Sequence, residues 1–112
     1  MSEREFQTKI ETTYMVKIYM SGPIEIAKQV IRKYCMNVGL CVTIEPTTFV
    51  YTGGEEQGFV IGLLQFPKFP KNENTIDNIA VEMAKALIEE TYQWSALIVT
   101  PTETRWINTR PE

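Results

Sequence analysis

A long apolar hairpin at residues 40–66 constrains this chain more than any other feature of its sequence. Residues 40–51 are rich in β-branched and aromatic side chains, and residues 59–66 are apolar at nearly every position, so both read as strands. The glycine-rich segment 52–58 is predicted to be the turn between them. A returning strand that is apolar on both faces needs cover on both, and the helices of so small a chain cover only one. The sequence therefore predicts an oligomer before it indicates any chemistry.

The chain has the size and composition of one folded domain. It has 112 residues, of which 44% are hydrophobic, and a net charge of −3 at pH 7. This mild acidity argues against non-specific binding to DNA, which needs clustered positive charge. Residues 1–12 are polar and charged, and we expect them to form a flexible arm before a single domain at 13–112. No apolar run approaches the roughly 20 residues of a membrane span, so we expect a cytoplasmic protein, in the host cytoplasm if the source is viral.

The apolar periodicities predict the element order β-α-β-β-α-β. Gly39 is placed to end the first helix, and Thr75 is expected to cap the second. Pro46 puts the first hairpin strand at an edge or a bulge. This order predicts an α+β, ferredoxin-like fold, in which a four-stranded antiparallel sheet carries two helices on one face and its first and third strands are central. The strands are expected at 14–20, 40–51, 59–66 and 95–100 and the helices at 24–38 and 76–92, with 102–107 as a further extended segment.

The residue types argue against catalysis. The chain has no histidine, the commonest general base near neutral pH, and no serine or cysteine stands in a nucleophile motif. Cys35 and Cys41 lie in apolar patterns, which favours buried and inert free thiols, although their spacing also permits a disulfide. We therefore expect no catalytic residue, no metal site and no cofactor.

Four short motifs carry a resemblance to a known family. The segments Cys41-Val-Thr-Ile-Glu-Pro46, Tyr51-Thr-Gly-Gly-Glu-Glu56, Ile61-Gly-Leu-Leu64 and residues 27–34 are similar to motifs of the CutA (divalent-cation tolerance) proteins of the PII-like superfamily. The stretch between Pro46 and Tyr51 is one residue shorter than in that family. Because the chain has no histidine, a histidine-based metal site does not carry over. A more general resemblance to small phage accessory proteins rests on no particular residue.

The resemblance to CutA implies a trimer, favoured over a dimer, with ligands held in clefts between subunits near the base of the hairpin. The expected ligand is small, anionic and nucleotide-like. Lys17 or Arg105 would reach across from a neighbouring copy, and Tyr51 or Trp106 would stack on a ring. On this chain the implied ligand-binding residues are Lys17, Thr47, Thr48, Tyr51, Gly53, Gly54, Arg105 and Trp106.

Three further motifs each keep two interpretations. The glycines of 52–58 make either a plain turn or a backbone site for an anion. Glu55 and Glu56 are either solvated tip residues or a carboxylate pair. The loop 66–70 interleaves aromatics, prolines and a lysine, and forms either a contact surface or a rigid exit from the strand. Nucleic-acid binding is not expected, because residues 59–64 carry no lysine or arginine.

The sequence thus predicts a non-enzymatic, oligomeric, PII/CutA-like protein that senses or sequesters its ligand. The alternative is an adaptor or inhibitor of a partner enzyme, and a metal-dependent or carboxylate enzyme is the third possibility. The adaptor would bind through the acidic hairpin and the loop that follows it. Its contact residues would be Glu55, Glu56, Phe66, Lys68 and Phe69.

Overall fold

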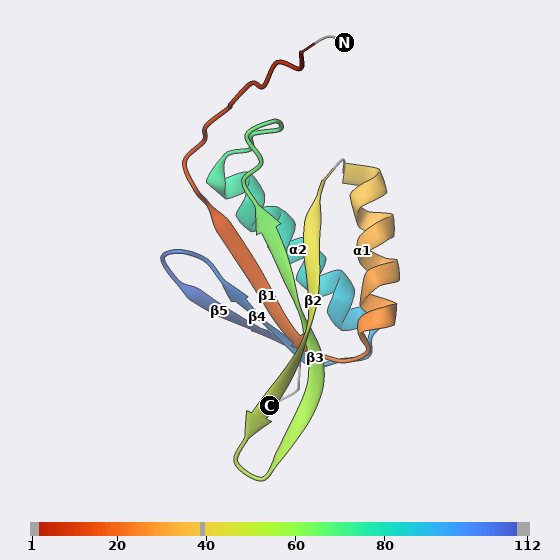
Figure 1. Ribbon diagram of the computed structural model, residues 1–112. Coiled ribbons are helices and arrows are strands. Elements are labelled where there is room, and N and C mark those ends of the chain that lie inside the picture. Colours follow the sequence, from red (N-terminus) through yellow and green to blue (C-terminus); the bar gives the residue numbers. More distant parts are fainter. Residues whose placement is uncertain (1–2, 39, 110–112) are drawn as a thin grey trace.

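The computed structural model describes residues 3–38 and 40–109, which form a five-stranded antiparallel sheet with two helices on one face (Figure 1). The strand order is β2-β3-β1-β4-β5, so the first and third strands are interior, as predicted. The α+β class, the antiparallel pairing and the two helices are confirmed. The strands are β1 (Met15–Ser21), β2 (Val42–Tyr51), β3 (Gly54–Leu64), β4 (Ser95–Val99) and β5 (Thr104–Asn108), and the helices are α1 (Ile24–Val38) and α2 (Glu73–Glu90).

The prediction of four strands is wrong, because the chain after β4 folds back and adds β5 at the edge of the sheet. Pro101 ends β4, and Thr100 closes a short turn by donating its backbone N–H to the Glu103 carbonyl over 2.9 Å. The Thr100 hydroxyl also accepts from the backbone N–H of Glu103 over 3.1 Å. The extended segment expected at 102–107 is thereby placed antiparallel to β4, with Trp106 opposite Leu97.

The hairpin turn is shorter than predicted. Tyr51 of β2 pairs with Gly54 of β3, so only Thr52 and Gly53 lie between the strands. Gly53 has a φ of 95°, which favours glycine at this tight turn. Residues 54–58 therefore belong to β3, not to a loop, and the two strands run together well beyond the rest of the sheet (Figure 1). The position of Pro46 on β2, an edge strand, agrees with the prediction.

The second helix begins earlier than predicted. Asn72 is its N-cap, and its side-chain oxygen accepts from the backbone N–H of Thr75 over 2.7 Å, so Thr75 is not the cap. The helix ends at Glu90 because the chain turns at Thr91 and enters a left-handed conformation at Tyr92. The first helix has its predicted bounds. Gly39, predicted to end it, lies outside the described residues.

The core lies between the sheet and the helices. Alternate residues of β1 and β3 point into it, while those between them form the opposite, open face of the sheet. The N-terminal arm precedes β1 and extends away from the domain (Figure 1). Its described part, residues 3–13, is exposed and has no helix or strand. The division between arm and domain stays a prediction, and residues 1–2 and 110–112 lie outside the described ranges. The largest fully buried side chains are those of Phe59, Ile18, Met20, Ile61, Leu63, Met83, Leu87, Ile98 and Val16.

Both cysteines are free, and they differ in exposure. Cys35 is half-buried, and burial raises the pKa of its thiol, which favours an unreactive group. Cys41 is exposed, so the prediction that both thiols are buried is wrong for this residue. Cys41 directly precedes the edge strand β2. The alternation of side chains along this strand turns the Cys41 side chain away from the core.

Tyr14 joins the start of β1 to α2. Its hydroxyl donates to the Asp77 carboxylate over 2.8 Å, and its ring is buried. Burial, followed by this bond and the charge of Asp77, raises the pKa of Tyr14 to about 12 from 10.0. The unfolded state therefore releases this proton first as the pH rises. The stability that depends on the protonated phenol is complete below pH 10 and is lost between pH 10 and about 12.

We expect Tyr14→Phe to lower the free energy of unfolding at pH 7 by about 1 kcal/mol, because the hydrogen bond is lost. The gap between wild type and variant should narrow by pH 11, since only the wild type loses the contribution of the phenol. Urea denaturation of both proteins at the two pH values measures this. An equal difference in the free energy of unfolding at both pH values would contradict the link between the Tyr14 pKa and stability.

We expect Gly58→Ala to lower stability by about 3 kcal/mol, because the added carbon overpacks the sheet. A Cβ at Gly58 would lie 2.1 Å from the Met20 carbonyl oxygen and 2.6 Å from the Phe49 ring. Gly54→Ala is the matched control, since the nearest atom there is the Tyr51 hydroxyl at 3.3 Å. Thermal denaturation of the two variants compares them, and similar melting temperatures would contradict the packing argument.

Candidate binding groove on the open face

The pairing register brings distant polar and aromatic residues together on the open face of the sheet. Residues directly opposite each other in an antiparallel pair share a face. Ser21 of β1 lies opposite Gly58 of β3, and Phe49 of β2 lies opposite Glu56 of β3. Because Gly58 has no side chain, the Phe49 ring lies directly over its backbone.

A groove of about 260 Å³ opens between the base of the hairpin and the start of β4. Tyr19, Phe49, Trp94 and Trp106 supply four aromatic rings from β1, β2, the start of β4 and β5. Trp106 is 66% exposed and Trp94 is 48% exposed. The polar side chains of the lining are those of Ser21, Glu56, Gln93 and Ser95.

Glu56 is held in place by two hydroxyl groups. Ser21 donates to one carboxylate oxygen over 2.6 Å, and Tyr51 donates to the other over 3.3 Å. The negative charge of Glu56 raises the pKa of the Tyr51 phenol. The ion pairs of the described residues, all between other side chains, leave Glu56 without a lysine or arginine partner. The groove thus carries a fixed negative charge among aromatic rings, which suits a flat ring system joined to a cationic centre.

A second hollow, of about 240 Å³, lies further along the same face. It is lined by Met15 and Lys17 of β1, Thr43 and Glu45 of β2, and Val60, Gly62 and Leu64 of β3. Its floor is the backbone of Gly62. We refer to it as the trough.

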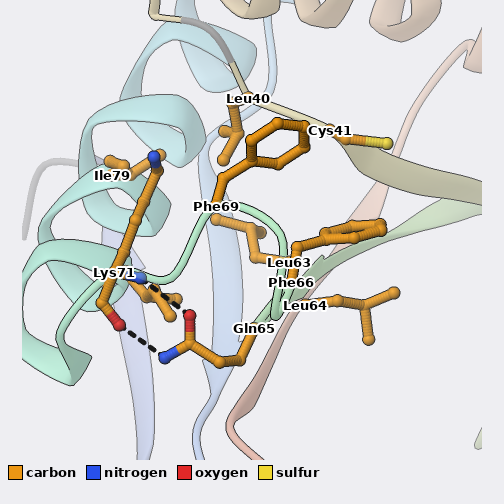
Figure 2. Close-up of a pocket in the computed structure, with 10 residues that line it drawn as sticks. Leu40, Cys41, Leu63, Leu64, Gln65, Phe66, Phe69, Lys71 and Ile79 are labelled. Atoms are coloured by element: carbon orange, nitrogen blue, oxygen red, sulfur yellow. Dashed lines mark hydrogen bonds between the residues drawn. The ribbon is translucent and has the colours of Figure 1, made fainter. Parts of the chain in front are cut away.

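A third hollow lies under the loop that leaves β3, and it is too small for a ligand. Its free volume of about 10 Å³ is roughly that of a single water site. Figure 2 shows the Gln65 side chain bonded to both the backbone N–H and the carbonyl oxygen of Lys71, which pins the loop. The Phe69 ring covers Leu40, and the Lys68 ammonium lies 5.6 Å from the centre of that ring.

The structure brings together only part of the predicted ligand site. Trp106 lines the groove and the Tyr51 hydroxyl contacts it through Glu56, whereas Lys17 lines the trough. Thr47 is on the open face opposite Gly58. The remaining predicted residues lie elsewhere: Thr48 bonds Gln57 on the other face, Gly53 and Gly54 form the hairpin tip, and Arg105 points to the helix side, where it pairs with Glu103.

The predicted partner-binding residues are also divided. Glu55 and Glu56 point to opposite faces of the hairpin, opposite Val50 and Phe49 respectively, so they do not form a carboxylate pair. Phe66, Lys68 and Phe69 form the loop of the third hollow. Their role in partner binding stays a prediction. Sequence reasoning missed Ser21, Phe49 and Trp94 as groove residues, and only the alternation of β2 placed Phe49 on the same face as Tyr51.

In the part of the chain that the structure describes, no three acidic, cysteine or histidine side chains gather as they would around a metal ion. None of the described helices is long and apolar enough to cross a membrane.

Two solved structures have the overall fold of this chain. One is a phage SAM lyase in its apo state, with a TM-score of 0.72 and 11% identity over 96% of this chain and 99% of that chain. The other is a phage SAM lyase in complex with S-methyl-5'-thioadenosine, with a TM-score of 0.67 and 10% identity over 94% and 96% of the two chains. At this identity the likeness shows the fold. No protein-family model matches the chain, and no curated protein does.

These neighbours contradict the prediction of a non-enzymatic sensor, adaptor or inhibitor, because both are enzymes. That prediction gave too much weight to the lack of histidine, which excludes one kind of general base but not every kind of catalysis. The neighbours neither support nor oppose the resemblance to CutA, which stays a prediction together with the trimer.

Proposed function

We propose that this chain is a lyase that cleaves S-adenosyl-L-methionine (SAM) and releases S-methyl-5'-thioadenosine. The observation that carries the proposal is the groove, which is lined by four aromatic side chains and by a carboxylate with no cationic partner among the described residues. The shared fold with two phage SAM lyases supports it.

The groove has the two features that a sulfonium nucleoside requires. Its aromatic rings offer stacking surface to a purine, and Glu56 offers a negative charge to the positively charged sulfur. Ser21 and Tyr51 hold both carboxylate oxygens of Glu56, so the charge is already oriented before the ligand arrives. A small anion, the ligand expected from the sequence, would be repelled here.

The reaction can proceed without a histidine. The bond between the sulfonium sulfur and the methionine-side carbon breaks, and its electron pair goes to sulfur, which becomes a neutral thioether. The leaving group therefore needs no proton. The four-carbon fragment is completed either by attack of its own carboxylate on that carbon or by loss of a proton from the neighbouring carbon. Correct positioning of the reacting carbon against the attacking or proton-accepting group then supplies most of the catalysis.

Chromatography of SAM incubated with the purified full chain tests the proposal. We expect S-methyl-5'-thioadenosine and one equivalent of a four-carbon amino-acid product, whose mass spectrum and chromatographic retention separate a lactone from an unsaturated amino acid. An enzyme-free sample is the control, because SAM decays slowly by itself. Formation of the thioadenosine no faster than in that control would overturn the proposal.

We expect Glu56→Gln to raise KM for SAM by about tenfold, because it removes the charge opposite the sulfonium, and to change kcat less. Glu55→Gln is the matched control, since Glu55 neighbours it in sequence and faces the other side of the hairpin. Steady-state kinetics of both variants separate the effects. Equal changes in the two variants would argue against a role for the groove charge.

We also infer a ferredoxin-like topology, in which β4-β1-β3-β2 is the common sheet and β5 is an added edge strand. Its open face carries apolar side chains that are more than a third exposed, such as Met15 and Leu97. A neighbouring copy would cover them and roof the groove. Light scattering should give about three times the chain mass of 12.9 kDa, and a mass equal to one chain would contradict the association.

A further inference from the structure

The trough next to the groove is shaped by a missing side chain. Gly62 of β3 lies between Lys17 of β1 and Thr43 of β2 on the open face. A Cβ at Gly62 would lie only 2.5 Å from the Thr43 hydroxyl oxygen, so the threonine excludes any larger residue at this position unless it moves. The backbone is therefore bare at the floor of a hollow of about 240 Å³.

Opposite charges stand on the two sides of this hollow. Lys17 and Glu45 both line it, from strands that flank β3 on either side, so their Cα rows lie roughly 10 Å apart. The ion pairs of the described residues do not include either side chain. Two long, flexible side chains of opposite charge can close on a small molecule that carries both charges. A molecule that ends in an α-amino-acid group carries both charges, because an ammonium and a carboxylate are attached to one carbon.

The trough and the groove share a border. Tyr19 lies opposite Val60, and Val60 lies opposite Glu45. Tyr19 lines the groove, whereas Val60 and Glu45 line the trough. Along β1, Lys17 and Ser21 are four residues apart, which is roughly 13 Å in a strand. One extended molecule can therefore place a nucleoside in the groove and an amino-acid end in the trough.

We propose that the trough is the subsite for the α-amino-acid end of the substrate, an inference that rests on the proposed function. The Lys17 ammonium binds the carboxylate of the substrate, and the Glu45 carboxylate binds its ammonium group. The trough then makes the site specific for adenosyl compounds that keep the amino-acid group.

Calorimetric titration with two unreactive ligands tests this subsite. S-adenosyl-L-homocysteine carries the amino-acid group, S-methyl-5'-thioadenosine lacks it, and neither has a sulfonium. We expect Lys17→Met and Glu45→Gln each to raise the Kd of the homocysteine compound about tenfold and to leave the Kd of the thioadenosine within about twofold. Lys85→Met is the control, because Lys85 is on α2, where it pairs with Glu82. It should change neither Kd.

A third ligand tests which trough residue binds the ammonium group and which binds the carboxylate. The decarboxylated form of S-adenosylhomocysteine keeps the ammonium group and loses the carboxylate, so its Kd should rise in Glu45→Gln and not in Lys17→Met. Suppose that the wild type binds the first two ligands, and that the trough variants raise the Kd of both ligands equally or of neither. That result would overturn the subsite and leave the proposed function standing. Wild type that binds neither ligand and releases no thioadenosine from SAM would overturn both. Circular dichroism of each variant confirms that it is folded.

Discussion

The pairing of β3 with β1 on one side and β2 on the other is the interaction on which the rest of the structure depends. On the helix side of β3, Phe59 and Ile61 fill the core. On the open side, Gly58 and Gly62 leave space where other residues would place side chains. The same strand therefore places large apolar side chains in the core and leaves two positions on the open face without a side chain. The groove lies beside the first glycine and the trough lies over the second.

The sequence was sufficient for most of the fold and for little of the site. The helical period of α1 is a local pattern, so it predicts the bounds of this helix correctly. The groove depends on register, which a turn fixes. A turn of seven residues leaves Glu56 in a loop, whereas the actual turn of two places it in β3 opposite Phe49. That difference separated Glu56 from the aromatic residues it meets.

Two other errors arose where local signals compete. Asn72 and Thr75 both have side chains that can cap a helix, and in the structure Asn72 is the N-cap. Pro101 correctly predicts the end of a strand, but the hydrogen bonds of the Thr100 turn determine that the chain returns to the sheet as β5. In each case the missing information was a contact made in the folded chain. The prediction of a non-enzymatic protein is wrong for a different reason, since general acid–base chemistry is only one route to catalysis.

In the proposed reaction, the groove would separate the forces that bind a sulfonium substrate from those that bind its product. Aromatic rings interact with a purine equally before and after the reaction, because the base does not change. The attraction between Glu56 and sulfur exists only while the sulfur is charged, and bond cleavage removes that charge. A carboxylate placed here strengthens substrate binding without strengthening product binding, so it favours release of the neutral thioether. Glu56 therefore gives the proposed lyase a preference for substrate over product that stacking alone does not provide.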